Sequence, residues 1–233
     1  ADSWAPDQNG PWTHGVRGPY VSTDSVAFTG DGASVLQSAS VPDVAAREDG
    51  TLVMIYVDGD LDALLAAADS HTPLSTGLIG FGGLGAATSA DGVAWTKAKL
   101  TFDLPLPAYA VDPELLALPD GTWALYFYGV PAAELCANAP DPFLVPSAHR
   151  LYRAVSEDLL AWTGVTEVWQ NPEGGVDPTV WCVDSTRCYG WFSAGIVSDD
   201  GGVSFVATDT ISASWNPQVP EVVRLASGEW RMY

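Results

Sequence analysis

Basic residues are scarce in this sequence. Its 233 residues hold 9 lysines and arginines against 29 aspartates and glutamates, which gives a net charge of −20, and its only lysines are Lys97 and Lys99. A surface of this charge repels phosphate backbones and anionic lipid, so we expect neither nucleic acid nor membrane-surface partners. Neutral polar ligands or cations fit the charge better.

Long hydrophobic runs are also missing. No apolar stretch approaches the roughly 18 residues that a membrane-spanning helix needs, so we expect no membrane insertion. The first ten residues, ADSWAPDQNG, have neither the basic end nor the apolar segment of a targeting peptide. A chain that begins at Ala1 without methionine is typical of a processed protein, and we expect it to be secreted or periplasmic.

Cysteine and histidine are few, which limits the chemistry available. Cys182 and Cys188 flank a polar turn and would face each other across a hairpin, so the sequence predicts a disulfide and an oxidising compartment. Cys136 is interpreted as a buried thiol rather than a nucleophile. The histidines lie far apart without ligand spacing, which argues against a zinc site or a Ser-His-Asp triad. They are His14, His71 and His149.

The abundant residues indicate β structure. Ten tryptophans, 23 glycines and 17 prolines accompany short β-rich runs, and only residues 60–70 are expected to form a short helix. Four segments repeat one order, in which a valine and a proline beside an acid precede an apolar strand, a polar turn and an aromatic strand. They read SVPDVAAREDGTLVMIYVDG, AVDPELLALPDGTWALYFYG, GVDPTVWCVDSTRCYGWFSAG and QVPEVVRLASGEWRMY, with the acids Asp43, Asp112, Asp177 and Glu221.

A second motif alternates with the first. Serine or threonine is followed two residues later by aspartate, at Asp31, Asp91, Asp158 and Asp200. These aspartates are expected to brace hairpin turns through bonds to backbone N–H groups, with Trp95 and Trp162 in the core. The step from this motif to the next strand-starting acid is 19 to 21 residues in three of the four pairs.

Alternating motifs of this period are typical of the four-stranded blades of a β-propeller. The fold class predicted is therefore all-β, with one propeller domain over residues 1–233 and blades that start near residues 40, 110, 175 and 218. The acid-bearing strands would be innermost and the four acids would surround one axis. Residues 18–38 could complete the last blade and close a four-bladed ring; alternatively the chain is part of a five-bladed propeller.

These motifs resemble the five-bladed family 43 glycoside hydrolases and, in the Ser-x-Asp turns, their sialidase-like relatives. The resemblance implies that Asp112 is a general base, Asp177 an acid that orients and tunes it, and Glu221 the general acid. Asp43 lies in an equally good motif and is the alternative base, with Asp112 then the tuner. Sialidases also need an arginine cluster, and the seven arginines of this chain do not repeat at equivalent positions.

Carboxylates around a channel mouth have the chemistry of glycoside hydrolysis. Direct attack by water needs one protonated and one ionised carboxyl about 6.5–9.5 Å apart, and repulsion raises one pKa, so an inverting mechanism on a neutral carbohydrate is predicted. Trp181 and Tyr109 would stack on the sugar. The alternative is a propeller that binds glycan or protein without chemistry, its acids bracing strands or holding a cation such as Ca²⁺.

One glycine motif is rejected. GFGGLG matches the dinucleotide-binding pattern at Gly80, Gly82 and Gly85, but it runs directly into a Ser-x-Asp turn where that pattern requires a helix. A nicotinamide or flavin dinucleotide cofactor is therefore not expected.

Overall fold

The described part of the chain consists of β-strands and connections. The computed structural model describes residues 15–17, 34–37, 39–58, 83–107, 109–131, 149–170, 174–175, 177–211 and 220–232, and within these ranges no residue is helical. Accordingly, no helix of these ranges is long and apolar enough to cross a membrane. The helix expected at 60–70 lies outside these ranges, as do Asp31, Cys136, His14 and His71.

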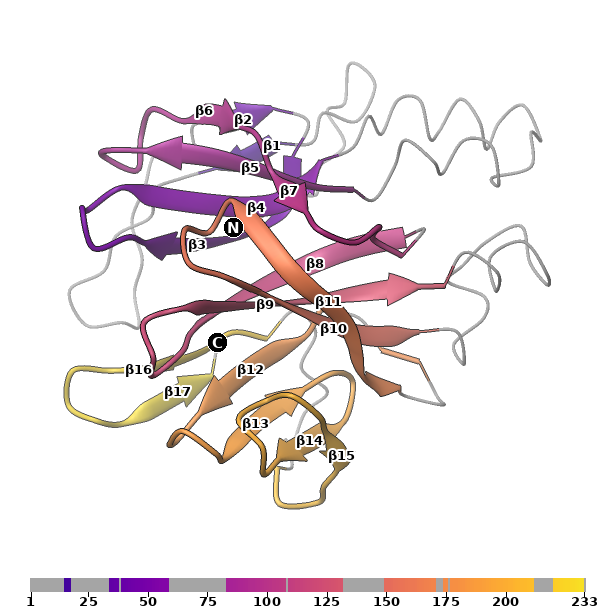
Figure 1. Ribbon diagram of the computed structural model, residues 1–233. Coiled ribbons are helices and arrows are strands. Elements are labelled where there is room, and N and C mark those ends of the chain that lie inside the picture. Colours follow the sequence, from indigo (N-terminus) through magenta and orange to yellow (C-terminus); the bar gives the residue numbers. More distant parts are fainter. Residues whose placement is uncertain are drawn as a thin grey trace, which may run out of the picture. The chain divides into compact units, whose positions relative to one another are not determined.

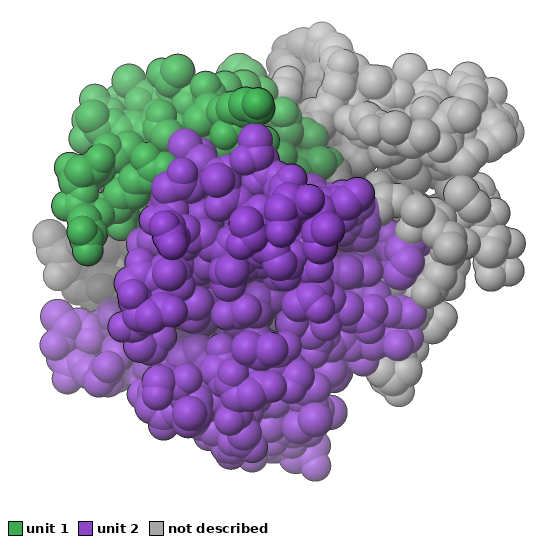
Figure 2. Space-filling model, in the orientation of Figure 1, with its two compact units in different colours: residues 1–100 green, residues 101–233 purple. Residues whose placement is uncertain are grey.

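The chain divides into two compact units, residues 1–100 and 101–233 (Figure 2). The first unit contains a small sheet of β1 (Gly15–Arg17) and β2 (Ser34–Gln37). It also contains a four-stranded antiparallel sheet in simple order, made of β3 (Ala39–Ala46), β4 (Leu52–Asp58), β5 (Gly83–Ser89) and β6 (Thr96–Ala98). Gly85 lies within β5, where a Cβ would come 2.7 Å from the ring of Tyr56, so this glycine serves strand packing.

The second unit contains three sheets (Figure 1). The first has the order β7-β11-β10-β9-β8 and comprises β7 (Thr101–Phe102), β8 (Tyr109–Ala117), β9 (Trp123–Val130), β10 (Arg150–Ser156) and β11 (Ala161–Gln170). The second consists of β12 (Thr179–Cys182), β13 (Cys188–Trp191), β14 (Gly195–Ser198) and β15 (Val206–Ala207). The third pairs β16 (Val222–Arg224) with β17 (Trp230–Met232).

The first strands of these three sheets are neighbours. Strand β12 contacts both β8 and β16, although each belongs to a different sheet. Sheets that meet along their first strands are expected of propeller blades, in which those strands are innermost. Strands β3, β8 and β12 each lie at one edge of their sheet. The prediction that the strands beside the acids are innermost around one axis stays a prediction.

Aromatic residues fill the space between the two larger sheets of the second unit. Tyr126 of β9 is fully buried, donates its hydroxyl to the carbonyl of Gly202 and meets the ring of Phe205 edge-on at 6.0 Å between centroids. Tyr128 packs against Phe192 at 6.2 Å. Each such buried side chain contributes about 2–3 kcal/mol, which holds the β8 and β12 sheets face to face.

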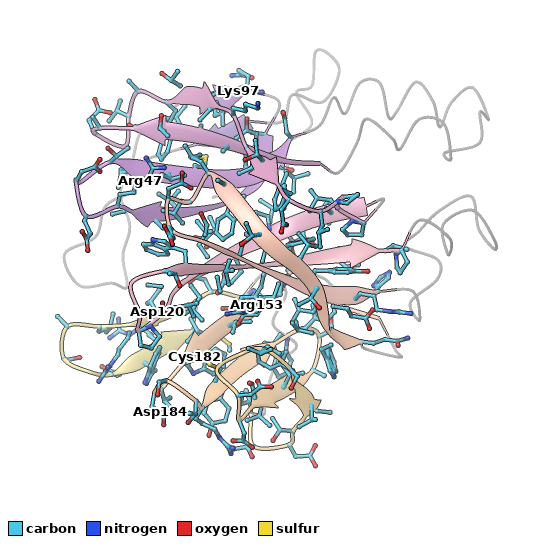
Figure 3. All side chains as sticks on the ribbon, viewed as in Figure 1. Arg47, Lys97, Asp120, Arg153, Cys182 and Asp184 are labelled. Carbon is cyan, nitrogen blue, oxygen red and sulfur yellow. A yellow bond between two sulfur atoms is a disulfide. The ribbon has the colours of Figure 1, made fainter. Side chains whose placement is uncertain are left out.

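The turns have the chemistry that the sequence predicts. At the β8–β9 turn, Gly121 adopts a left-handed φ of 86° and Asp120 accepts the N–H of Thr122 at 3.0 Å. Asp184 caps the β12–β13 turn in a related way by accepting the N–H groups of Thr186 and Arg187 at 2.8 and 2.7 Å. Figure 3 labels both aspartates at their hairpin tips.

The three described Ser-x-Asp motifs form the turns between the third and fourth strands of their sheets. At the first, Asp91 accepts the N–H groups of Val93 and Ala94 at 2.8 and 2.9 Å and contacts Ser89 at 3.0 Å. Asp158 and Asp200 repeat this arrangement. The expected bracing is therefore present. Trp162 is buried at 1% exposure, and Trp95 is partly buried against the core of the first unit.

The disulfide agrees with its prediction. Cys182 and Cys188 are opposite each other in the β12–β13 register and are joined (Figure 3). The predictions of a single domain over residues 1–233, and of closure by residues 18–38, stay predictions. Among the described residues, β2 pairs with β1 and β16 pairs with β17.

Candidate active site

Two of the predicted acids stand at the same structural position. Asp112, within β8, and Asp177, two residues before β12, each precede a proline, and both have a left-handed backbone, with φ of 54° and 50°. Aspartate tolerates this region better than most residues, but a residue before proline normally prefers an extended backbone. Such a conformation persists where the surrounding structure holds it, and it is frequent at functional sites.

The other two acids occupy a different position. The register of β3 with β4 shifts between Ser40 and Asp43, and that of β8 with β9 shifts between Val111 and Glu114. The two bulges match each other, so Asp43 corresponds to Glu114, one residue beyond the proline. Glu221 also follows its proline.

Valine fills the position before the proline in these two repeats. Val41 shares the left-handed backbone of Asp112, with φ of 42°, and Val219 lies outside the described residues. The sequence motif of an acid beside proline therefore combined two structural positions, before and after the proline.

Asp112 and Asp177 are in contact across β8 and β12. The backbone N–H of Asp177 donates to Oδ2 of Asp112 at 3.2 Å. Within the described residues, no Lys or Arg forms an ion pair with either carboxylate. Two half-buried carboxyl groups thus lie together, and no cationic side chain of the described ranges pairs with them.

This environment changes their acidity. Burial, and after it the charge of Asp177, raises the pKa of Asp112 to about 7, although the N–H of Asp177 works in the opposite direction. Burial also raises the pKa of Asp177. A carboxyl with a pKa near neutrality exchanges a proton readily at the pH of most reactions, which is the property required of a general acid or base.

The other four predicted site residues are not described in contact with Asp112 or Asp177. Glu221 is exposed and directly precedes β16, the strand that contacts β12. Asp43 belongs to the first unit, where its Oδ1 accepts the N–H of Val44 at 2.6 Å. Trp181 lies in β12 beside Tyr189 at 6.0 Å between ring centroids, and Tyr109 is the first residue of β8. The roles proposed for these four residues stay predictions.

Glu114 is a residue that the sequence analysis missed. It is 5% exposed, and its Oε1 accepts hydrogen bonds from the Thr179 hydroxyl and the Val180 N–H, both at 3.0 Å. The signal was present in the sequence, because an alignment on the prolines places Glu114 opposite Asp43 and Glu221. From the sequence, the catalytic role is assigned to Asp112, which directly precedes Pro113, and not to Glu114.

No metal cluster accompanies the acid pair among the residues that the structure describes. In those ranges no group of three or more His, Cys, Asp or Glu side chains is arranged to hold an ion. His149 is buried beneath Tyr128, and its Nδ1 lies 3.1 Å from the N of Gly175 and 3.0 Å from its carbonyl oxygen. This histidine thus contacts the segment that leads to Asp177.

A hollow of about 450 Å³ lies on the sheet of β12 to β15. Its wall includes Trp191, Gly195 and Asp209 from the outer strands β13 to β15 and the residues after them. Neither Asp112 nor Asp177 is among its described lining residues. The acid pair therefore lies near the N-terminal ends of β8 and β12 rather than in this hollow.

Comparison with known proteins gives information on the fold. No protein-family model and no curated protein sequence matches the chain. Among solved structures, a protein of unknown function from Dyadobacter fermentans matches at 14% identity and a TM-score of 0.62, over 91% of this chain and 62% of that one. An endo-arabinase from Bacteroides thetaiotaomicron matches at 13% identity and a TM-score of 0.58, over 88% and 75%.

A third structure is a family 43 β-xylosidase/α-arabinofuranosidase from a compost microbial metagenome, solved with xylotriose. It matches at 15% identity and a TM-score of 0.55, over 84% of this chain and 64% of that one. The fold is that of the family 43 glycoside hydrolases. The predicted all-β, propeller-type class is thereby confirmed, and the number of blades stays a prediction. The chain spans about three fifths of the length of two of these three proteins.

Proposed function

We propose that this protein is a glycoside hydrolase that acts on a neutral carbohydrate by inversion. The observation that carries the proposal is the Asp112–Asp177 pair, in which burial and charge raise the pKa of Asp112 to about 7. The family 43-like fold supports the same chemistry, because neighbours of that fold are named as arabinase and xylosidase. The net charge of −20 disfavours an anionic substrate.

In the proposed mechanism Asp112 is the general base. Its ionised carboxylate takes a proton from a water molecule as the water oxygen attacks the anomeric carbon. Glu221 is the general acid and gives its proton to the leaving glycosidic oxygen as the carbon–oxygen bond breaks. After burial, the charge of Asp177 raises the pKa of Asp112, which makes Asp177 the tuner. Trp181 and Tyr109 are the proposed stacking residues for the sugar.

This assignment favours Asp112 over Asp43 as the base. Asp112 shares the position before proline with Asp177 and contacts it directly, whereas Asp43 follows its proline and accepts an N–H from its own strand. Because the base must be ionised, the rate constant kcat/KM is expected to rise as the pH passes through about 7.

The test is a screen of chromogenic arabinosides, xylosides and galactosides with the native protein, Asp112→Asn, Glu221→Gln and the control Asp120→Asn. Asp120 is an exposed turn residue of the same strand pair as Asp112. Loss of a general acid or base lowers the rate by about 10²–10⁴-fold, so the first two variants should be nearly inactive and the control fully active. NMR of the first-formed anomer reports inversion. Equal activity in all variants, or no cleavage of any sugar, would refute the proposal.

One observation favours a second function, a propeller that binds glycan without chemistry. The bond from the Asp177 N–H to Asp112 is what a structural brace between strands requires. In that case the native protein would bind sugars in a calorimetric titration without releasing product. The same screen, followed by titration of any sugar that is not cleaved, separates the two functions.

A further inference from the structure

Glu114 is an acid buried deeply enough that its placement requires a reason. Its side chain lies in β8, two residues after Asp112, at 5% exposure. A carboxylate removed from water is unfavourable unless hydrogen bonds satisfy it. Here one oxygen, Oε1, accepts bonds from two groups of the neighbouring blade, the Thr179 hydroxyl and the Val180 N–H.

Both donors follow directly after Asp177 and Pro178. Thr179 is fully buried, so water does not compete for its hydroxyl. The bond from Asp177 N–H to Asp112 and the two bonds to Glu114 therefore join the same two strands within four residues. Together they fix how far along β8 the start of β12 lies.

Such a fixation is needed at this point of the chain. Asp112 and Asp177 both hold a left-handed backbone ahead of a proline, which is an unfavourable conformation that relaxes unless the surrounding structure holds it. In β3, Asp43 occupies the position equivalent to Glu114, and it accepts the N–H of the next residue in its own strand. The longer Glu114 side chain instead reaches the next sheet.

A second contact secures the other side of Asp177. The N–H of Gly175 donates to Nδ1 of the buried His149, which directly precedes β10. The segment that carries Asp177 is thus held from the β8–β11 sheet both before and after the aspartate. This contact does not depend on Glu114, so a variant at Glu114 loosens one side of the segment only.

We infer that Glu114 is a positioning residue that sets the distance between the carboxyl groups of Asp112 and Asp177 through its bonds to Thr179 and Val180. The inference rests on the proposed function, since the pair that Glu114 positions is the proposed base and its tuner. Glu114 itself touches neither the water nor the sugar in this scheme. Its effect on the reaction passes through Asp177.

The test compares Glu114→Gln with Glu114→Ala. Gln keeps an oxygen that can accept both bonds but has no charge, so kcat should stay within about threefold of native. This change is much smaller than the loss expected when the two carboxyl groups are misplaced. Ala removes both bonds, and a displacement of about 1 Å at the pair should lower kcat by about 10²-fold with KM little changed. Thr179→Val removes one donor and should give an intermediate loss of kcat. Thr179→Ser keeps the hydroxyl and should have the native kcat.

A titration separates this inference from the proposed function. The titration of Asp112 can be followed at its carboxyl carbon by ¹³C NMR in the full chain. In Glu114→Gln the midpoint of this titration should lie near that of the native protein. In Glu114→Ala its midpoint should fall, because Asp177 moves away and water enters. This readout needs no substrate, so it holds even if no sugar is cleaved.

Three results would overturn the inference. The first is an unchanged Asp112 midpoint and kcat in a folded Glu114→Ala protein whose melting temperature alone is lower, since that is a purely structural role. The second is an equal fall of the midpoint in Glu114→Gln and Glu114→Ala, because charge rather than geometry would then be responsible. Where Glu114→Ala does not fold, Thr179→Val with a native midpoint and native kcat would be the third.

Discussion

Aspartates at the strand starts and at the outer turns have opposite chemistry. Asp91, in an outer turn, is exposed, and N–H donors from Ala94 and Val93 hold its pKa below the ordinary value. Asp112, in the N-terminal half of β8, is half-buried beside a second carboxylate, and its pKa is raised to about 7. The side chain is the same, so donors and access to water decide whether an aspartate braces a turn or exchanges a proton.

The largest effect on stability that this comparison predicts is at Asp112. Its folded pKa lies above the unfolded value of 3.8, so its contribution is complete below about pH 4 and is lost as the pH rises through about 7. Asp112→Asn never ionises, and it should be more stable than native by up to about 4 kcal/mol at pH 8 and equal to it at pH 4. Urea unfolding at both pH values measures this. A variant that is less stable than native at pH 8 would contradict the comparison.

An opposite and smaller effect is expected at Asp200 in the outer turn of the β12 sheet. Slight burial works against it, but hydrogen bonds from Ser198, Ser204 and Val203 lower the pKa of Asp200 to about 2. The stability from Asp200 is therefore present above about pH 4 and lost as the pH falls through 2. Asp200→Ala should lose about 1–2 kcal/mol at neutral pH, since the turn is open to water.

The matched control for this loss is the exposed Asp209, which follows the last strand of the same sheet. Asp209→Ala should unfold at the native urea concentration at pH 7. Equal losses at Asp200 and Asp209 would show that the turn bonds contribute nothing. If the stability lost in Asp200→Ala became larger as the pH fell toward 2, the predicted pH dependence would be wrong.

The smallest effect on activity is expected at the disulfide, which separates the stability of the fold from the chemistry of the site. The Cys182–Cys188 bond closes a short loop at the turn end of the β12–β13 hairpin, whereas Asp177 precedes the other end of β12. Replacing both cysteines by alanine should cost about 2 kcal/mol or less, mainly through the unfolded chain, and leave kcat/KM at the native value. If the double alanine variant lost activity but kept the native stability, the hairpin tip would influence the acid pair and this prediction would be wrong.

Much of the fold was visible in the sequence because local chemistry determines it. Asp120 and Gly121 specify a turn wherever they occur between apolar strands, and Ser89 with Asp91 braces its own backbone. These signals repeat at a fixed period, which is why the strands, the turns and the disulfide partners could be predicted. None of them depends on contacts between distant segments.

The arrangement of the acids was less accessible, because it depends on register. A bulge between Val111 and Glu114 decides that Asp112 and Glu114 have different surroundings, and nothing in the sequence marks that bulge except the proline. Burial of Glu114 against Thr179 is a contact between residues 65 positions apart. An alignment of the repeats on their prolines would have separated the two positions, but it would not have shown the partner.

The most direct test of the account is the titration of the Asp112 carboxyl in the native protein by ¹³C NMR, with Asp177→Asn beside it. We expect a native midpoint near pH 7 and a lower one in the variant, which lacks the charge of Asp177 but keeps the burial. A native midpoint near the ordinary 3.8 would contradict it, because Asp112 would then be one more solvated carboxylate like those of the outer turns.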